Sequence, residues 1–214
     1  MIRLLIIFSF LVTVPAHALI ELKAHYGKWT GEPKDFNTRI ESTFVNHPNF
    51  SGPDIIGGDL LLTPMMMTWV FGVRYESFDM KESGDITVSG LTISSDASVK
   101  GHRTSALLGK RFVSLPVGYI GILFHYGLEN KADYNLNLGG VDNKYNGVVD
   151  TSYGGGIESA FKLGPLLMGA EIGYTCFKVK KWNDSSKNPI SDSSGEIPFD
   201  LTGMYYHVTL GVSL

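Results

Sequence analysis

The chain has 214 residues, of which 43% are hydrophobic, 18% charged and 12% aromatic, and its formal net charge is −3. This composition excludes a disordered chain, which buries too little apolar surface to fold, and a nucleic-acid-binding protein, which needs a basic surface. The single cysteine, Cys176, excludes an intrachain disulfide and a zinc site built from cysteines. Ten tyrosines and twelve phenylalanines, beside 25 glycines, favour β-structure.

Residues 1–18 have the pattern of a secretory signal peptide. Arg3 opens a short basic start, an apolar run follows, and Ala16-His17-Ala18 forms a small-x-small cleavage site. The apolar run ends at Pro15 after about a dozen residues, whereas a membrane-spanning helix needs ~20. We therefore expect cleavage after Ala18, which leaves one domain over residues 19–214.

Apolar and polar residues alternate along the rest of the chain with the period of two that a half-buried strand requires. The pattern is strict at 118–129, where Ile120, Ile122 and Phe124 share one face and His125 lies on the other. In chain order the predicted strands are residues 20–30, 56–63, 67–76, 99–113, 118–129, 149–163, 166–176 and 205–214.

Prolines and polar stretches separate these strands, because proline cannot donate in a sheet ladder. Pro64, Pro116 and Pro165 lie in short connections, and long polar connections alternate with them. All short turns therefore lie at one end of the sheet and all long loops at the other. The predicted loops are residues 31–55, 79–98, 130–147 and 183–199.

These features predict an all-β fold: an eight-stranded antiparallel up-and-down transmembrane β-barrel with short periplasmic turns and long extracellular loops. A soluble, secreted barrel of the lipocalin type has the same alternation turned inside out. The apolar faces favour the membrane interpretation, because they begin and end with Tyr, Trp or Phe, as an interfacial girdle does. The opposite faces carry glycines and charges, which line an apolar ligand site poorly.

The chain resembles the small eight-stranded outer-membrane barrels of Gram-negative bacteria, the class of the OmpA transmembrane domain and its OmpX/Ail-like relatives. In the last strand Tyr206, Val208, Leu210 and Val212 fit the alternating assembly signal of that class, and Leu214 replaces its terminal aromatic residue. The resemblance implies a monomer in the outer membrane of a Gram-negative bacterium, in contact with membrane lipid and lipopolysaccharide.

Charged and polar side chains alternate with the apolar ones and are predicted to face the lumen. A barrel of eight strands is just wide enough to be filled by side chains, and charges excluded from water persist only when paired. We therefore expect a plugged, non-conducting lumen. Its predicted polar network comprises Glu21, Lys23, His25, Asp59, Arg74, Glu76, Arg103, Arg111, His125, Glu129, Asp150, Glu158, Glu171 and His207.

Three histidines, His25, His125 and His207, share this inward face. Because the first and last strands become neighbours when the barrel closes, His25 and His207 are expected to lie near one another. We interpret them as lumen polar groups rather than metal ligands, and expect no cofactor.

An enzymatic function is the alternative that the resemblance raises, since some eight-stranded outer-membrane barrels modify lipid A with a His, a Ser and an acid near the outer rim. The His-x-Ser-Asn pattern of the deacylases does not occur in this sequence. His102 and Ser105 are three residues apart and face opposite sides of a strand, so they do not form a base and nucleophile pair. We therefore expect a non-enzymatic protein with a structural or surface-interaction role.

The long loops are where that role would reside. Phe36, Ile40 and Phe44 recur at a spacing of four and predict a short amphipathic helix that either caps the barrel mouth or offers a protein partner an apolar stripe. Around Ser89-Gly90, alternating apolar residues predict a hairpin that projects past the membrane with an open edge suited to strand addition. Loop 183–199, with five serines, is expected to be flexible and solvated.

Four lysines lie near the loop end of the barrel and are candidates for contact with lipid A phosphates. They are Lys28, Lys178, Lys180 and Lys181.

Overall fold

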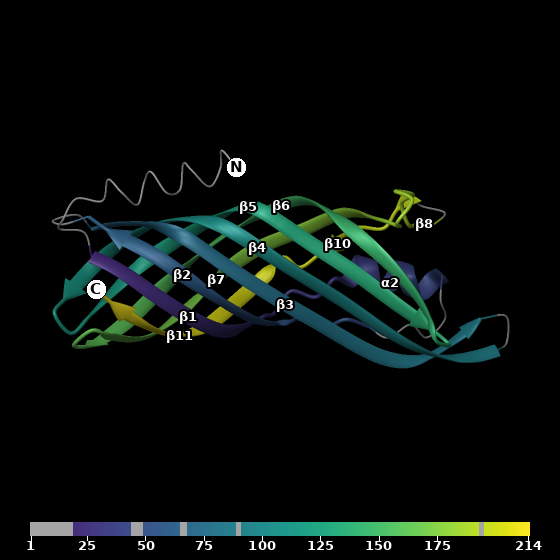
Figure 1. The fold of residues 1–214 in the computed structure, drawn as a ribbon, viewed down its shortest axis with the longest axis horizontal. Coiled ribbons are helices and arrows are strands. Elements are labelled where there is room, and N and C mark those ends of the chain that lie inside the picture. The colour runs from purple at the N-terminus through teal and green to yellow at the C-terminus, as the bar shows by residue number, and fades with distance from the viewer. Residues whose placement is uncertain (1–18, 44–48, 65–67, 89–90, 193–194) are drawn as a thin grey trace.

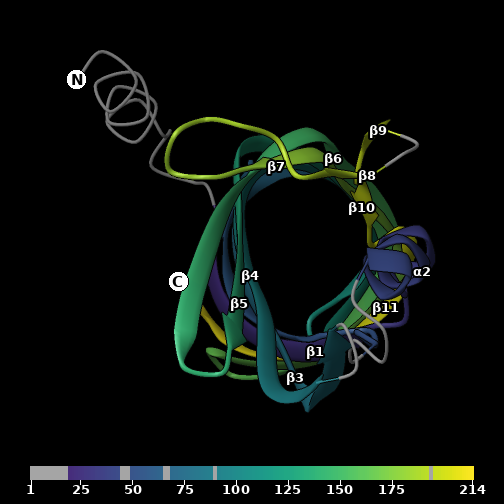
Figure 2. The same cartoon turned by 90° about the vertical axis from the view of Figure 1, so that its right-hand side faces the viewer.

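A computed structural model of the chain describes residues 19–43, 49–64, 68–88, 91–192 and 195–214. It consists almost entirely of tilted antiparallel strands that close into an elongated barrel (Figures 1 and 2). The elements of the wall are β1 (Leu19–Trp29), β2 (Asp54–Thr63), β3 (Trp69–Val88), β4 (Leu91–Leu115), β5 (Gly118–Leu138), β6 (Val141–Leu163), β7 (Leu166–Asn183) and β11 (Gly203–Ser213). The remaining elements are α2 (Lys34–Thr43), β8 (Ser191–Asp192), β9 (Gly195–Glu196) and β10 (Phe199–Asp200).

The ring closes where β11 inserts between β7 and β1. Each wall strand pairs antiparallel with its chain neighbour, and β11 pairs with both β7 and β1. At the turn end, the backbone N–H of Ile20 donates to Leu214 and that of Leu214 donates to Ile20, at N···O distances of 3.1 and 2.8 Å. The structure confirms the predicted eight-stranded up-and-down barrel.

The outer surface of the barrel carries an apolar belt. Six outward tyrosines are 49–65% exposed. On β1, β11, β7 and β6 each tyrosine is offset by two residues, in the cross-strand register, from the tyrosine on the preceding strand, as the stagger of tilted strands requires. They are Tyr26, Tyr75, Tyr126, Tyr153, Tyr174 and Tyr206. Nearer the turns Trp69, Phe112 and Phe161 are exposed as well, with only apolar and small residues between the two levels. Two aromatic girdles around an apolar band fit a lipid environment and contradict a soluble lipocalin-like barrel.

In the part of the chain that the structure describes, no helix is long and apolar enough to span a bilayer.

Five of the wall strands are much longer than a membrane requires. About 10 residues cross the hydrocarbon layer, but β3 to β7 have 18–25 residues each. The predicted loops 79–98 and 130–147 are therefore wrong as loops, because β3 and β4 pair as far as Val88 and Leu91 and β5 turns into β6 through Gly139-Gly140. Beyond the membrane the outward face no longer needs to be apolar, so the strands turn apolar residues such as Tyr134 and Leu136 inward and polar ones outward while the backbone ladder continues.

The long connections also contain more structure than their polarity indicates. The predicted helix is present as α2, which lies against the outer half of the wall on the side of β10 (Figure 2). The expectation that residues 183–199 are solvated is wrong in part, because Ile197 and Phe199 are 1% and 0% exposed. Residues 89–90, the centre of the predicted Ser89-Gly90 hairpin, lie outside the described part.

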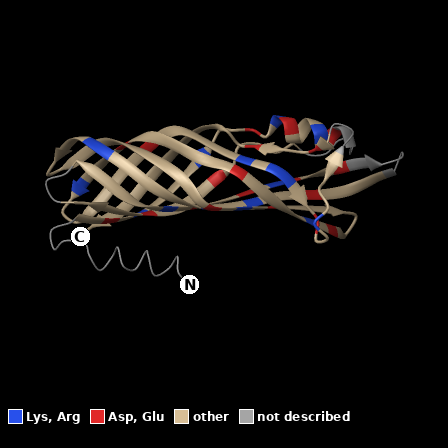
Figure 3. Cartoon of the chain, turned by 90° about the horizontal axis from the view of Figure 1, so that it is seen from above, with Lys and Arg blue, Asp and Glu red and all other residues tan. Residues whose placement is uncertain are grey.

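The interior is divided into two zones. The half near the turns is filled by charged side chains, described below. The outer half is filled by an apolar, largely aromatic core, whose largest members are Trp29, Trp182, Tyr134, Tyr205, Phe36, Phe50, Phe177 and Phe199. In Figure 3 uncharged ribbon predominates in the barrel half that lies away from α2.

Candidate functional site

The charged zone begins near the turns with a first layer of ion pairs. Lys23 Nζ lies 2.8 Å from Glu158 Oε2 and 3.7 Å from Glu21 Oε2. Arg111 Nη2 donates to Glu21 Oε2 at 2.5 Å, and its guanidinium lies 3.7 Å from the centre of the Tyr119 ring. All five side chains are at most 6% exposed, so each charge is neutralised by its neighbours rather than by water.

A second layer lies further along the barrel and is centred on Arg74. Its guanidinium donates to both oxygens of Asp59, at 2.8 and 2.9 Å, and to both oxygens of Glu171, at 3.0 and 2.6 Å. Tyr205 donates its hydroxyl to Glu171 Oε1. Two bidentate forks on one arginine bridge β2, β3 and β7 across the lumen.

Glu76 and Arg103 form the other ion pair of this second layer. Arg103 Nε donates to Glu76 Oε2, and Arg103 Nη1 donates to Thr175 Oγ1 at 2.8 Å. The Arg103 guanidinium also stacks over Trp29, 4.8 Å from the ring centre, where the charged zone meets the aromatic core.

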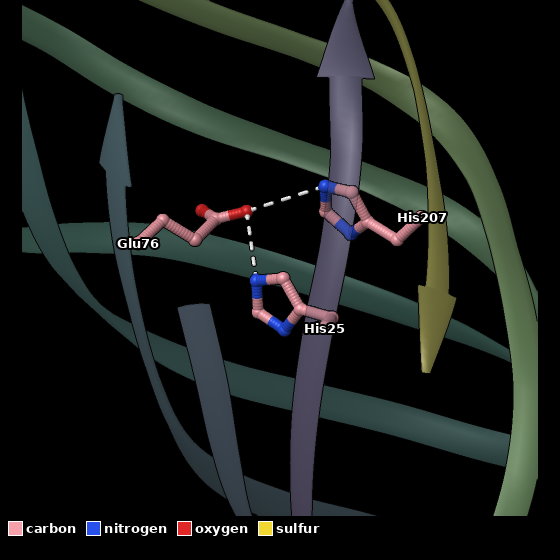
Figure 4. A group of neighbouring side chains, drawn as sticks. All are labelled: His25, Glu76 and His207. Atoms are coloured by element: carbon pink, nitrogen blue, oxygen red, sulfur yellow. Dashed lines mark ion pairs between the residues drawn. The ribbon is translucent and has the colours of Figure 1, made fainter. Parts of the chain in front are cut away.

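Two histidines complete the second layer (Figure 4). His25 on β1 and His207 on β11 are stacked, with ring centres 4.6 Å apart and planes 13° from parallel, so the predicted proximity of these residues is confirmed. The Nε2 atoms of His25 and His207 lie 3.7 and 3.6 Å from Glu76 Oε1, and His25 Nδ1 lies 3.6 Å from Asp59 Oδ1. His125 lies apart from this group, edge-on to Tyr205 with ring centres 6.1 Å apart.

Glycines provide the space that the three rings occupy. A Cβ at Gly57 would lie 2.4 Å from His25 Nε2, one at Gly27 2.5 Å from His207 Cδ2, and one at Gly154 2.3 Å from His125 Nε2. Each ring therefore packs on bare backbone of a neighbouring strand. The glycine pattern was visible in the sequence, but its pairing with histidines needs the strand register.

One predicted lumen residue, Glu129, is placed on the outside of the barrel, so that prediction is wrong. The β4–β5 register shifts between Thr104 and Ser105, where Leu128 is the extra residue of a bulge, and the shift turns the following residue outward. The Glu129 side chain is 62% exposed and lies 3.3 Å from Lys131 Nζ. Asp150 is exposed for the same reason, at a bulge in β6.

The four predicted lysines lie beyond the tyrosine girdle, but in two places. Lys28 is level with Tyr206 in the strand register, about 20 Å along the strand direction from the position of Lys178. Lys178 Nζ lies 2.8 Å from Asp200 Oδ2, and this hydrogen bond raises the pKa of the lysine. Lys181 pairs with Glu196 at 3.1 Å. Within the described residues, Lys28 and Lys180 are exposed and have no acidic partner within 4 Å.

Helix α2 lies at the side of the outer half, next to β10, and packs its apolar side chains into the outer core rather than presenting an apolar stripe (Figure 2). Phe36 and Ile40 are 0% and 1% exposed, so the prediction that they contact a partner is wrong, and Phe44 lies outside the described residues. The Phe36 ring packs edge-on against Tyr134 and Phe199, with both ring centres 5.3 Å away. Burying these side chains in the barrel removes more apolar surface from water than a free helix would.

The aromatic core in the outer half is the feature that sequence reasoning missed. Trp29, Phe78 and Phe177 point inward beyond the charged zone, and Trp182 lies nearer the rim. The sequence does carry a signal for this core, because an apolar residue stands at an inward-facing position just after each polar lumen segment. This signal is weak because apolar residues in a membrane barrel are expected on the outside.

The arrangement offers structural support rather than an evident reaction centre. Ser105 is buried and faces inward, whereas His102 lies on the outward side near Tyr75, with ring centres 6.0 Å apart. A nucleophile and base separated by the barrel wall cannot act together.

No protein-family model matches this chain, and no curated protein matches it. Among solved structures, Ail, the attachment invasion locus protein of Yersinia pestis, in complex with the heparin analogue sucrose octasulfate, is similar with a TM-score of 0.47 and 9% identity over 92% of this chain and 99% of that one. A major outer membrane protein from Thermus thermophilus has the same TM-score and coverage, with 12% identity. The closed ring of strands and the outward apolar belt described above give the chain the fold of a small transmembrane β-barrel.

Proposed function

We propose that this outer-membrane barrel is a non-conducting, non-enzymatic protein that acts through its outer surface and the strands that project beyond the membrane. The observation that carries the proposal is the double closure of the interior. Within the membrane the lumen is crossed by two layers of ion pairs, and beyond the membrane the same lumen is filled by an aromatic core to which α2 contributes. A solute would have to displace both.

The interior therefore serves as a scaffold, and contacts with other molecules fall to the exterior. The β3–β4 ribbon is the most extended part of that exterior. β2 pairs with β3 only as far as Asp79, whereas β3 continues to Val88, so nine residues present a backbone edge that no described strand covers. At about 3.3 Å per residue this edge is ~30 Å long. We propose that it accepts an extended segment of a partner protein by strand addition.

Lys28 and Lys180 are proposed to contact the phosphates of lipopolysaccharide. Both are exposed on the loop side of the tyrosine girdle, Lys28 two residues beyond Tyr26 on β1 and Lys180 six residues beyond Tyr174 on β7, and this is the side on which lipid headgroups meet the barrel. Their lack of an acidic partner in the described chain leaves their ammonium groups available, whereas Lys178 and Lys181 are engaged by Asp200 and Glu196. A phosphate brought to these lysines would form charge-assisted hydrogen bonds.

Conductance of the full chain in planar lipid bilayers tests the main proposal. We expect no channel openings from the wild-type protein. Reproducible unit conductance, absent from an empty-detergent control, would contradict the plugged interior. Mass spectrometry of lipid A after expression tests the non-enzymatic part, and a change in acyl chains would contradict it.

The lysine proposal is tested by flotation with vesicles that contain lipopolysaccharide. The double variant Lys28→Gln/Lys180→Gln should bind more weakly than wild type, with the difference shrinking at high salt. Lys144→Gln removes a similar exposed charge far along the β5–β6 hairpin and should bind as wild type. Equal loss in both variants would mean that only net charge matters.

A further inference from the structure

His25, Glu76 and His207 are placed as the ligands of one metal ion would be. They come from β1, β3 and β11, and one donor atom from each lies within 4.8 Å of the other two. The two Nε2–Oε1 distances are 3.7 and 3.6 Å. Two ligand atoms that are each about 2.1 Å from a four-coordinate Zn²⁺ lie about 3.4 Å apart, so the two histidine–glutamate distances need to shorten by only a few tenths of an ångström. The donor atoms of the two histidines, which lie within 4.8 Å of each other, need to approach by up to about 1.4 Å.

The donor atoms of this group are buried without partners. Glu76 Oε1 and both ring nitrogens of His25 and of His207 accept or donate no hydrogen bond within the described structure. The three residues are 1–3% exposed, so water does not reach them from bulk solvent. Buried polar atoms are nearly always satisfied, and a single ion would satisfy one from each side chain.

The charge of the second layer also calls for a cation. The layer holds three buried carboxylates, of Asp59, Glu76 and Glu171, but only two guanidiniums, of Arg74 and Arg103. With neutral histidines it has a net charge of −1 from these five groups. Lys23, the next cation along β1, is held by Glu158 and Glu21 in the first layer. An uncompensated charge at this depth is costly, and a bound cation removes it.

Neighbouring charged groups orient two of the ligands. Arg103 takes up Glu76 Oε2 and leaves Oε1 facing the histidines. Asp59 Oδ1 lies 3.6 Å from His25 Nδ1, just beyond hydrogen-bond length, so a small approach would let it accept a hydrogen bond from that nitrogen and leave the Nε2 lone pair free. Carboxylate–histidine–metal chains of this kind recur in protein zinc sites.

We propose that His25, Glu76 and His207 bind a divalent transition-metal ion, with Zn²⁺ the ion that this ligand set suits best. The sequence predicts that the two histidines lie close together but indicates no third ligand. The position of Glu76 supplies that ligand and favours a metal site over the interpretation of the histidines as lumen polar groups. Two imidazoles and one carboxylate form a set used by zinc proteins, with the fourth position left to water. The lone pair of each imidazole nitrogen lies in the plane of its ring, so two parallel stacked rings cannot both direct a lone pair at the same ion. One of the rings therefore turns about its Cβ–Cγ bond on binding. Gly27 and Gly57 place no Cβ against these rings.

The ion would act as a structural clamp on the closing seam of the barrel. β1 and β11 are the first and last wall strands, and their pairing is the step that closes the ring. A metal bound by His25 and His207 crosslinks these two strands, with Glu76 adding β3. The site lies between the first charged layer and the aromatic core, so we assign it no catalytic role, and loading is expected before closure is complete.

Metal content and stability of the full chain in detergent micelles test the proposal. Protein refolded with Zn²⁺ and then desalted should contain one zinc per chain by elemental mass spectrometry. Unfolding and refolding in the presence of a chelator should give a metal-free barrel with a lower unfolding temperature than the zinc-loaded one. Co²⁺ in place of Zn²⁺ should give the visible absorption of a four-coordinate site. A wild-type protein that retains no stoichiometric metal after refolding with Zn²⁺ overturns the proposal.

Two matched variants separate the site from adventitious binding. His207→Phe keeps the stacked ring but removes the ligand nitrogen, and should weaken zinc binding at least 10-fold. His125→Phe removes another buried histidine that also packs on a glycine and has unpartnered nitrogens, and should keep one zinc per chain. Gel migration before and after boiling checks that each folds; if His207→Phe does not, His25→Gln replaces it with the same expectation. Equal zinc content in the ligand variant and in His125→Phe overturns the assignment.

Discussion

Arg74 provides the most direct test of how the charged interior stabilises the barrel. It is fully buried and makes four hydrogen bonds, two to Asp59 and two to Glu171. Arg74→Met keeps an unbranched side chain of moderate length but leaves two carboxylates facing each other without their shared cation. Removing one partner of a buried ion pair costs about 3–5 kcal/mol, because the remaining charge stays desolvated.

This loss should be visible as a fall in unfolding temperature of roughly 6–20 °C, taking about 2–4 °C per kcal/mol for a chain of this size. Urea unfolding of the detergent-solubilised barrel, followed by tryptophan fluorescence and by migration of unboiled samples, would measure the change in free energy. Adding Glu171→Gln to Arg74→Met removes one of the two facing charges and should recover part of the loss.

Lys131→Met is the control, because it deletes a cation from an exposed pair. Lys131 and Glu129 are 3.3 Å apart with side chains 59% and 62% exposed, so the expected loss is about 0–1 kcal/mol. If Arg74→Met were as stable as Lys131→Met, the hydrogen bonds of Arg74 to Asp59 and Glu171 would do no more than offset the free-energy cost of burying these charged groups. The account of a lumen held together by ion pairs would then be refuted.

Three further changes test other parts of the structure. Phe36→Ala should cost about 3–5 kcal/mol and increase amide hydrogen exchange in α2, because its ring fills the outer core; unchanged exchange would contradict the anchoring of α2 by this ring. Gly154→Ala should lower stability by about 1–3 kcal/mol in urea unfolding, since its Cβ would lie 2.3 Å from His125 Nε2 and 2.6 Å from the backbone oxygen of Tyr174, whereas a neutral result would show that both the ring and the backbone adjust freely. The backbone N–H of Asn188 holds the pKa of Asp184 below its ordinary value, so this contact stabilises the β7–β8 turn above about pH 4 and is lost as pH falls through the lowered pKa; NMR titration would measure it, and an unshifted pKa would contradict the turn geometry.

The membrane-spanning part of the fold was accessible from sequence because lipid imposes a strict rule. Outward positions must be apolar and backbone groups must pair within a closed ring, so alternation and proline placement specify strands and turns. The same parity placed His25, Arg74 and Glu171 correctly inside the barrel. It failed at Glu129, because a bulge adds one residue without leaving a mark on local composition.

Beyond the membrane the rule no longer applies, and sequence reasoning lost its strongest signal. The strands on either side of Gly139-Gly140 turn apolar residues such as Tyr134 and Leu136 inward and are polar on the outward face, so they lack the outward apolar belt that predicts a membrane strand and were expected to be a loop. The grouping of Glu76 with the two histidines could not be predicted either, because it depends on how far each side chain reaches across the lumen. Strand register and rotamers settle that distance, and neither is encoded in a local pattern.

The aromatic core of the outer half has a consequence for the order of folding. Trp29, Phe78 and Phe177 belong to β1, β3 and β7, which come together only when the ring is closed. None of these rings can be buried by a single hairpin, so the outer half has no way to fold in advance as an independent unit. Closure of the seam and packing of the core should therefore occur as one cooperative event. An unclosed intermediate would expose aromatic surface in its longest strands, the species most prone to aggregate during assembly.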